Sequence, residues 1–308
     1  ATAYEAMHKN AFTTPATYAE YADGMGRRAL TSYLTYGYIP VEDSVKEAYH
    51  RQEQTSRTLE YAYDDFVLAQ VAQLLGHTAD HDTLMLRSEN YRHVIDPATG
   101  YANGRHANGR FLPDSNPYTF APYITEGAPC HYTWYVPHNP YGLIEAMGGR
   151  DRFIGTLDPL FTERRYWHGN GRCHPVAYLY NCAGEPWKTQ RIVRHILDTE
   201  YGDTPGGLAG NDDAGQMSAW YIFSALGFYP VCPGTPYYQI GTPTFERATL
   251  HLENGHTFTI EAPGTSSERC YIQSAILNGK SYPHTYLHHD DILRGGVLRF
   301  VMSDRAGY

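Results

Sequence analysis

The sequence has no long apolar run, since no segment approaches the roughly 18–20 apolar residues that a membrane-spanning helix needs. It also has no excess of basic residues: 24 Lys and Arg stand against 33 Asp and Glu, a formal net charge of −9. Binding to nucleic-acid phosphates needs a basic face, so this charge argues against that class of protein. The opening residues ATAYEAMHKN have no Met start and no targeting segment, and they read as a helix interior. We therefore expect a truncated or processed chain.

Cysteines are few and scattered, and none stands in a C-x-x-C pair, which argues against a thiolate zinc site or a thioredoxin-type motif. They form no disulfide framework either, so we expect thiols with at most one or two bridges and leave the redox compartment open. The sequence also lacks G-x-S-x-G, a P-loop, a dinucleotide-binding glycine motif with its acidic residue, and H-E-x-x-H. These absences argue against common serine hydrolases, nucleotide-binding folds and zinc metalloproteases.

The pattern of apolar residues predicts helices up to about residue 235. Most of these helices end at a glycine, which takes the left-handed conformation found after a last helical turn. The predicted helical segments are 58–75, 140–147, 174–183, 187–199 and 215–226. Several medium helices joined by loops suggest layered helical hairpins.

After residue 236 the apolar period changes from 3.6 to 2, which predicts strands. Asn254-Gly255 and Asn278-Gly279 lie between such runs, and Asn-Gly favours a tight type I′ hairpin turn. We therefore expect a mainly α chain with a C-terminal antiparallel β module. The Pro- and Gly-rich segment 230–236 is the predicted linker, so the two parts are residues 1–235 and 236–308.

Two adjacent carboxylates, Asp212 and Asp213, precede the helix predicted from about Gly215. One Asp is enough to cap a helix N-terminus, which leaves the other able to act as a base in a cleft. Glu126 lies in a loop rich in aromatic residues and histidine, where a glutamate kept protonated can act as a general acid; a solvated loop glutamate is the commoner case.

A third loop, residues 166–174, contains Trp167, His168 and Asn170, but its two histidines and one cysteine match no standard zinc spacing. A binding loop with aromatic platforms is at least as consistent with this composition. In the predicted helix 58–75, Asp64 and Asp65 are poor mid-helix residues. At least one of them is expected in a buried network or a site, and for Asp64 we favour a structural role, as a buried ion pair or a cap to a neighbouring helix.

Aromatic loops with separated carboxylates on a helical scaffold suggest carbohydrate chemistry. Four strings in a fixed order then carry a resemblance to glycoside hydrolase family 92, the calcium-dependent exo-acting α-mannosidases. They are EYAYDDF (60–66), EGAPCHYTWYVPH (126–138), AYLYNCAGEPWKTQ (177–190) and GNDDAGQMSAWYIFSALGFYP (210–230), continued by IGTPTF (240–245). The resemblance implies the later part of an (α/α)6 barrel, with a preceding β-sandwich domain missing from this chain.

The resemblance also implies inverting removal of terminal α-mannose, with α-1,2 linkages as the first choice and calcium as cofactor. It makes Glu126 the general acid, with Asp213 as the first and Asp212 as the second choice of base. It makes the following residues substrate contacts: His131, Trp134, Trp167, His168 and Asn211. Asn211 takes the place of a further family acid. The implied partners are mannose-containing glycans or glycoproteins, as in N-glycan degradation, and the implied location is secreted, periplasmic or on a bacterial outer surface.

One departure from the family pattern affects calcium. The family string resembles GNEPxH, whereas this chain reads Gly169-Asn170-Gly171-Arg172-Cys173-His174, so a carboxylate is lost and a cation is added. Asn170 remains as a candidate metal ligand. This change and the missing domain support an alternative, a non-catalytic carbohydrate-binding fragment of the same fold. A polysaccharide lyase is a weaker alternative, because the acidic chain does not suit a uronate-binding cleft.

Overall fold

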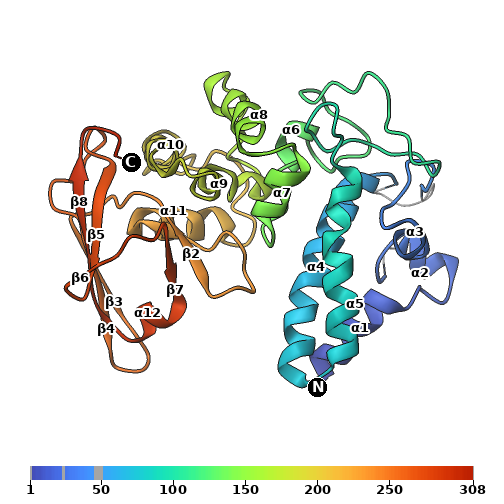
Figure 1. The fold of residues 1–308 in the computed structure, drawn as a ribbon, viewed down its shortest axis with the longest axis horizontal. Helices are drawn as coiled ribbons and strands as arrows, with labels where there is room; N and C mark the ends of the chain where they lie inside the picture. Colours follow the sequence, from blue (N-terminus) through green and yellow to red (C-terminus); the bar gives the residue numbers. More distant parts are fainter. Residues whose placement is uncertain (1, 23–24, 45–50, 308) are drawn as a thin grey trace. The chain divides into compact units, whose positions relative to one another are not determined.

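The computed structural model describes residues 2–22, 25–44 and 51–307. The chain divides into two compact units, residues 1–160 and residues 161–308 (Figure 1). The change from helices to strands, predicted near residues 235 and 236, lies inside the second unit. The assignment of residues 1–235 to one barrel part and 236–308 to one β module stays a prediction.

The first unit is helical. Its longest helix is α4 (Gln54–Leu75), which packs against α5 (Thr78–Ser88) and α1 (Thr2–Phe12) (Figure 1). Shorter helices are α2 (Tyr18–Ala22), α3 (Leu30–Tyr36), the 3-10 helix η1 (Glu89–Val94), α6 (Pro129–Tyr132) and α7 (Pro140–Ala146), and α8 (Arg150–Thr162) begins here.

Helix α4 follows its predicted pattern. It ends before Gly76, which has φ 79° and donates its backbone N–H back to the last turn, as predicted. It begins at Gln54, four residues before the predicted start at Thr58. Ala69 and Ala72 are fully buried on the face that meets α1 and α5, so small side chains set how closely these helices approach.

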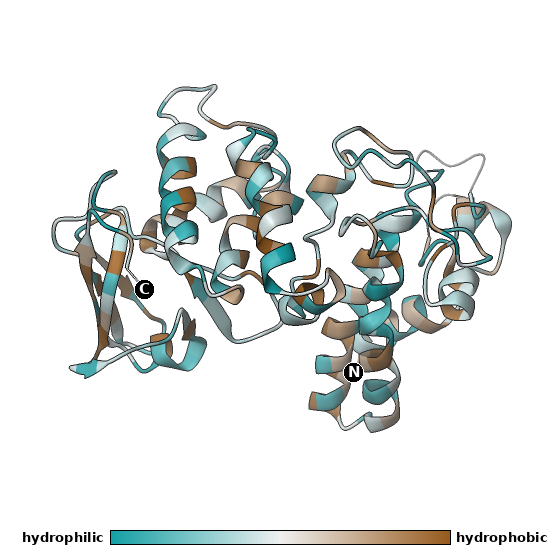
Figure 2. Cartoon of the chain, turned by 45° about the horizontal axis from the view of Figure 1, so that its top comes forward, coloured by the Kyte–Doolittle hydropathy of each residue, from teal (hydrophilic) through white to brown (hydrophobic). Residues whose placement is uncertain are grey.

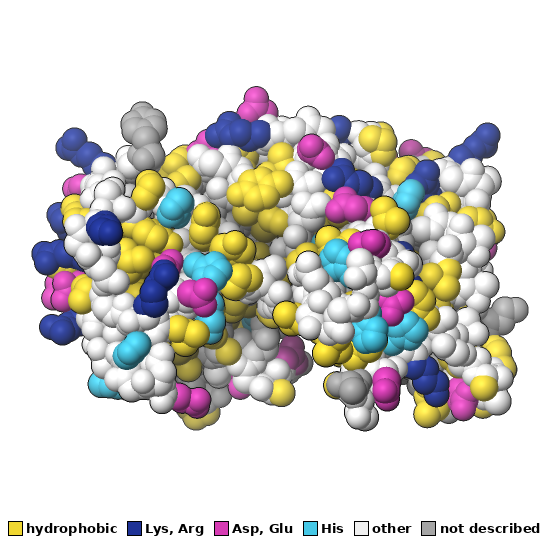
Figure 3. Space-filling model, turned by 60° about the horizontal axis from the view of Figure 1, so that its bottom comes forward, with side chains coloured by type: hydrophobic (Ala, Val, Ile, Leu, Met, Phe, Trp, Pro, Cys, Tyr) yellow, Lys and Arg dark blue, Asp and Glu magenta, His cyan; other side chains and the backbone are white. Residues whose placement is uncertain are grey.

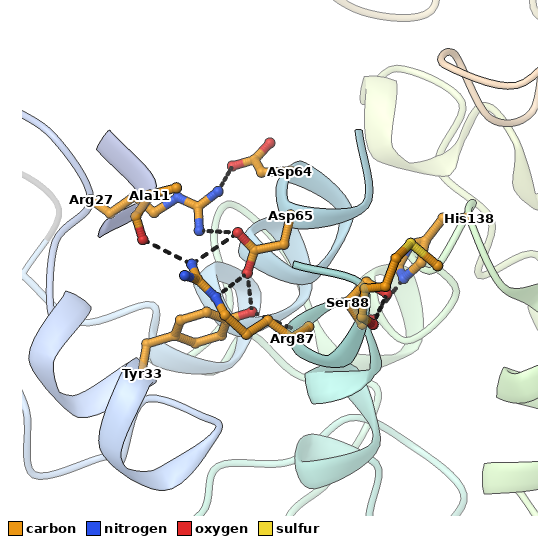
Figure 4. Close-up of polar contacts among 9 residues, drawn as sticks. Ala11, Arg27, Tyr33, Asp64, Asp65, Arg87, Ser88 and His138 are labelled. Atoms are coloured by element: carbon orange, nitrogen blue, oxygen red, sulfur yellow. Dashed lines mark hydrogen bonds and ion pairs between the residues drawn. The ribbon is translucent and has the colours of Figure 1, made fainter. Parts of the chain in front are cut away.

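A buried ion-pair network pins α4 to its neighbours, but its centre is Asp65 and not Asp64 (Figure 4). The Asp65 carboxylate is fully buried and accepts hydrogen bonds from Arg27 at 2.5 Å, Arg87 at 2.8 and 2.9 Å, and Tyr33 at 3.1 Å. The Asp64 side chain is 53% exposed and lies 3.9 Å from Arg27. The prediction chose the wrong aspartate because the two arginines come from segments far away in the sequence.

The second unit contains helices and two sheets. After the last residues of α8 come the 3-10 turns η2 (Gly171–Cys173) and η3 (Val176–Tyr178), then α9 (Leu179–Cys182), α10 (Pro186–Thr199), α11 (Gln216–Leu226) and α12 (His289–Leu293). The predicted single helix over 174–183 is therefore wrong, because residues 174–175 form a turn and the 3-10 helix η3 precedes the four residues of α9. Its predicted stop at Gly184 holds, with φ 74°.

One sheet has the strand order β1 (Phe228–Tyr229), β2 (Tyr237–Ile240), β7 (Tyr286–His288). The other has the order β3 (Arg247–His251), β4 (Thr257–Glu261), β8 (Gly296–Ser303), β5 (Tyr271–Leu277), β6 (Lys280–Ser281). The C-terminal strands are confirmed, but the module is not wholly antiparallel. Strand β8 enters between β4 and β5 and runs parallel to β4. Alternating burial gives the buried face of a strand and not its direction.

The two Asn-Gly pairs form different turns. Asn278 (φ 50°) and Gly279 (φ 79°) both have positive φ between β5 and β6, as a type I′ turn requires. At the other pair only Gly255 has positive φ, so the predicted type I′ turn there is wrong. The Asn254 side chain accepts from His256 N at 3.0 Å and donates to Leu293 O at 2.8 Å. These bonds hold a longer turn.

The core of the second unit lies between the strands and the ends of the helices. Phe258, Leu298 and Phe300 are buried with other strand residues, and Phe223 and Leu226 of α11 pack against them. The helices are banded brown and teal in Figure 2, as expected of helices with one buried face. A mainly helical chain with C-terminal sheets is thus confirmed; a barrel is not shown within the described residues. None of the helices described here combines the length and the apolar character needed to cross a membrane.

Candidate functional site

Two glycines bring two of the predicted loops together in the second unit. A Cβ at Gly169 would lie 2.6 Å from the carbonyl oxygen of Ala209, and a Cβ at Gly210 would collide with the backbone of Gly169. Real Cβ contacts are not that short, so only glycine fits at either position. The loop with Trp167 and Asn170 therefore lies directly against the loop that leads into Asn211, Asp212 and Asp213.

The two adjacent aspartates have different environments. The Asp212 carboxylate accepts hydrogen bonds from the backbone N–H and the hydroxyl of Ser218, both at 3.0 Å. Ser218 is the third residue of α11, so Asp212 satisfies one of the unpaired N–H groups at the start of this helix. Asp213 is exposed, and no described residue donates a hydrogen bond to its carboxylate.

The backbone after Asp212 is strained. Asp213, Ala214 and Gly215 have φ of 51°, 58° and 97°, so three consecutive residues take left-handed conformations. Such a conformation costs an L-residue about 1–2 kcal/mol, and strain of this kind concentrates at functional sites. The turn leaves the Asp213 carboxylate exposed beside the helix start. Asp212 is thus bound at the helix start while the Asp213 carboxylate is exposed, and Asp213 as the base stays a prediction.

A buried histidine connects the start of α11 to the 166–174 loop. His174 is fully buried, and its Nε2 lies 3.0 Å from the carbonyl oxygen of His168, so Nε2 carries the proton and donates. Its Nδ1 then accepts from the Gln216 side chain at 3.2 Å. Burial lowers the pKa of His174, although the charge of Asp213 acts in the opposite direction. A neutral imidazole therefore joins the 166–174 loop to the first residue of α11.

His168 forms a second buried link. It is 2% exposed, and its ring lies between the hydroxyls of Tyr166 at 2.9 Å and Tyr201 at 2.7 Å. Burial, followed by the neighbouring His174, lowers the pKa of His168 to about 3. Trp220 packs edge-on against this ring at 4.4 Å between centroids. His168 thus presents no surface to a sugar, and the prediction that it binds substrate finds no support in its position.

Glu126 lies in the first unit, on a loop fastened to α4. The Thr125 N–H donates to the Ser56 hydroxyl at 2.7 Å, and the N–H groups of Thr55 and Ser56 donate to the Tyr123 carbonyl. Glu126 itself is exposed and has φ 50°. As with Asp213, a strained turn places a carboxylate at the surface of a loop whose flanks are rigidly held.

The remaining predicted substrate contacts differ in their exposure to solvent. Trp134 is 1% exposed, its Nε1 donates to Cys130 O at 2.8 Å, and it packs against Phe153. It is a core residue, so its predicted contact with sugar is likewise unsupported. His131 is half-buried, and its Nδ1 accepts from Ala128 N at 3.3 Å, which caps the short helix α6. In the second unit, Trp167 is 39% exposed and Asn211 is exposed, so both are accessible.

Sequence reasoning missed Tyr201 and Gln216. Gln216 stands inside the string that carried the family resemblance, so its place next to the aspartates was a usable signal. Tyr201 had no such signal, because it lies after α10 and contacts His168 and the Met217 carbonyl only in the folded chain.

The described residues around Asn170 do not fit a divalent cation. The Asn170 side-chain oxygen accepts from the backbone N–H of Arg172 at 3.3 Å and from its guanidinium at 3.2 Å. Calcium prefers several oxygen ligands, usually including carboxylates, and a guanidinium repels it. Within residues 2–22, 25–44 and 51–307, no three His, Cys, Asp or Glu side chains gather as a metal site.

Comparison with known proteins identifies the family. The family model described as the glycosyl hydrolase family 92 catalytic domain matches residues 1–304. The chain belongs to glycosyl hydrolase family 92. Members of this family are generally calcium-dependent.

Solved structures of this family share the fold. The family GH92 alpha-mannosidase BT3965 from Bacteroides thetaiotaomicron is 42% identical with a TM-score of 0.88, over 99% of this chain and 39% of that chain. The family GH92 inverting mannosidase BT2199 from the same organism is 36% identical with a TM-score of 0.89, over 99% and 43%. An uncharacterized secreted glycosidase of Arthroderma benhamiae is 29% identical over 98% of this chain and 42% of its own length. The chain thus spans about two fifths of the length of these relatives.

Proposed function

We propose that the protein is an exo-acting α-mannosidase that hydrolyses terminal α-linked mannose with inversion. The observation that carries the proposal is that the carboxylates of Asp212 and Asp213 have different environments. Asp212 is occupied as a helix cap, whereas Asp213 is exposed and accepts no hydrogen bond from a described residue. In a chain of family 92, an available carboxylate on a strained loop is the group suited to activate water.

In the proposed reaction, Glu126 in its acid form donates a proton to the glycosidic oxygen as the bond to the anomeric carbon breaks. Asp213 accepts a proton from a water molecule, whose oxygen attacks the anomeric carbon from the opposite face. The products are free mannose in the β configuration and the shortened glycan. Inverting enzymes hold the two carboxyl groups about 6.5–9.5 Å apart, which leaves room for the attacking water.

The exposed residues on the two loops are the proposed sugar contacts. The Trp167 ring offers an apolar face for a pyranose, and Asn211 and His131 offer hydrogen-bonding groups. His168 and Trp134 take a different role: their buried rings hold the loops that carry these contacts.

Calcium remains a proposal at the level of the family. No step of the reaction is assigned to it here, because the Asn170 oxygen is already bound by Arg172 and no carboxylate stands at position 171. The proposed substrate is a mannose-containing glycan or glycoprotein, with α-1,2-linked mannose as the first choice. Secretion, N-glycan degradation and a preceding β-sandwich domain are proposed together with the activity.

A second candidate function is carbohydrate binding without turnover. The observation that favours it is the change to Gly171 and Arg172, which removes a carboxylate from the family string and adds a cation.

The test compares Asp213→Asn with Asp203→Asn, a matched change of another exposed aspartate on the same glycine-rich loop. Release of mannose from an α-1,2-linked mannobiose should fall at least about 100-fold in Asp213→Asn, since general base catalysis contributes roughly 10²–10⁴-fold. The control should keep its activity. Equal activity of the two variants would remove Asp213 from the mechanism. No release by the unchanged, folded protein would favour the binding-only function.

A further inference from the structure

A cavity of about 590 Å³ lies in the second unit between the end of α8 and one face of α10. Its volume is within the roughly 300–1,000 Å³ of pockets that bind small molecules. Its apolar lining comes from Phe161 and Tyr166 on one side and from Ile192 and Ile196 of α10 on the other. None of the residues proposed for catalysis lines it.

The charged side chains that line this cavity are mainly arginines. Arg164, Arg191 and His195 lie around it, together with one carboxylate, Glu200. At neutral pH two guanidinium charges therefore face one carboxylate, although the whole chain carries a net charge of −9. Arg191 and His195 stand four residues apart on α10, on the same side of the helix, with no acidic residue between them on that face.

The two arginines have no anionic partner among the described residues, and this sets them apart from their neighbours. Arg165 pairs with Glu163 at 2.8 Å, and the buried Arg194 donates to the carbonyl of Pro243 at 2.5 Å. Within the part of the chain that the structure describes, no carboxylate or carbonyl oxygen accepts a hydrogen bond from the guanidinium of Arg164 or Arg191.

A ring contact also orients the Arg191 side chain and leaves its N–H groups able to donate hydrogen bonds. Its guanidinium lies 5.2 Å from the centre of the Trp187 ring, a cation–π contact. Stacking uses the face of the guanidinium, whereas its N–H groups point outward in the plane and remain able to bind an oxyanion. A donor that is already oriented loses less entropy when it binds a ligand.

From this arrangement we infer that the cavity binds a phosphate group, carried by a phosphate monoester of monosaccharide size. The guanidinium forks of Arg164 and Arg191 match phosphate oxygens, and an imidazole N–H of His195 adds a third donor. The apolar lining accommodates the carbon skeleton of the ester. The inference stands independently of the mannosidase proposal, because it involves neither Glu126 nor Asp213.

Isothermal titration calorimetry at low ionic strength tests the inference with glucose 6-phosphate, inorganic phosphate and glucose as probes. We expect glucose 6-phosphate to bind, glucose not to bind, and affinity to fall as salt is added, since the attraction is electrostatic. Tighter binding of the ester than of inorganic phosphate would assign the ligand to an ester. Equal binding would assign the site to free phosphate. Both results support a phosphate site.

Two variants locate the binding. Arg164→Gln with Arg191→Gln should weaken phosphate binding at least tenfold, whereas Glu200→Gln should strengthen it by removing the one opposing carboxylate. The matched control is Arg247→Gln with Arg305→Gln, two exposed arginines of the same unit that do not line the cavity. The inference is overturned if glucose 6-phosphate does not bind at millimolar concentration, if glucose binds equally well, or if the double variant and the control bind alike.

Discussion

Asp212 and Asp213 are adjacent and chemically identical, yet the structure predicts that replacing each by alanine has opposite consequences. Asp212→Ala removes the acceptor for the backbone N–H and the hydroxyl of Ser218. It should destabilise the protein while the exposed carboxylate at position 213 remains. Asp213→Ala removes a carboxylate that accepts no hydrogen bond from a described residue, so it should cost activity and little stability.

The size of the first effect follows from the cap. Loss of an Asp cap costs about 0.5–2 kcal/mol, and the exposed position of Ser218 places the expected loss near the middle, about 1 kcal/mol. For a unit of this size, a loss of about 1 kcal/mol lowers the melting temperature by roughly 2–4 °C. Asp213→Ala should shift the melting temperature by less than half as much, because it breaks no such bond.

Thermal unfolding followed by circular dichroism measures both variants, with Asp203→Ala as the control for removing an exposed charge from the same loop. A melting temperature lowered only in Asp212→Ala, together with mannose release lost in Asp213→Ala, agrees with the assignment. Equal destabilisation by both variants, or full activity in Asp213→Ala, would refute the division of roles between cap and base.

Three further predictions concern buried charge, pH and calcium. Asp65→Asn should destabilise the protein by about 3–5 kcal/mol in urea unfolding, because it leaves Arg27 and Arg87 buried without their carboxylate, whereas Asp64→Asn should cost little. His168 is neutral in the folded protein, with its pKa lowered to about 3, but an unfolded chain protonates it below about pH 6.5. Stability should therefore fall as pH decreases from 6.5 toward 3, by about 3 kcal/mol at pH 4.5 from this group, and His168→Gln should flatten that slope. A Cβ at position 171 would lie 3.5 Å from Gln216 Cγ, an ordinary contact, so the double variant Gly171→Glu with Arg172→Ala should fold. We expect it to bind calcium at least tenfold more tightly in calorimetry. Unchanged affinity would mean that Gly171 and Arg172 do not weaken calcium binding.

Local features of the sequence predicted local features of the structure well. The helix ending at Gly76 and the turn at Asn278-Gly279 depend on which residues tolerate positive φ, and both are where the sequence placed them. The sequence also predicted that one of the two aspartates before α11 binds the helix start, and Asp212 accepts hydrogen bonds from Ser218 there. Each of these inferences needs only a few consecutive residues.

The features that could not be predicted depend on distant residues. Whether Asp64 or Asp65 is buried is decided by Arg27, from the segment before α3, and by Arg87 of α5. The parallel pairing of β8 with β4 depends on the path of the chain through β7 and α12. His168 and Trp134 looked like sugar-binding residues because aromatic and histidine side chains suit both a wet cleft and a packed core.

The same ambiguity applies to charge on a surface. On the face shown in Figure 3, Asp and Glu side chains lie among the Lys and Arg side chains. A net charge of −9 therefore did not reveal the local excess of arginine around the cavity beside α10. Composition describes the average surface, whereas a site depends on which few side chains the fold brings together.

The most direct test of the proposed mechanism is the configuration of the first sugar released. Proton NMR recorded during the first minutes of hydrolysis of α-1,2-linked mannobiose distinguishes the two anomers before mutarotation mixes them. The single displacement by Asp213-activated water predicts that β-mannose appears first and α-mannose only later. Initial release of α-mannose would contradict the account, because retention requires a covalent intermediate and a nucleophile in place of a base.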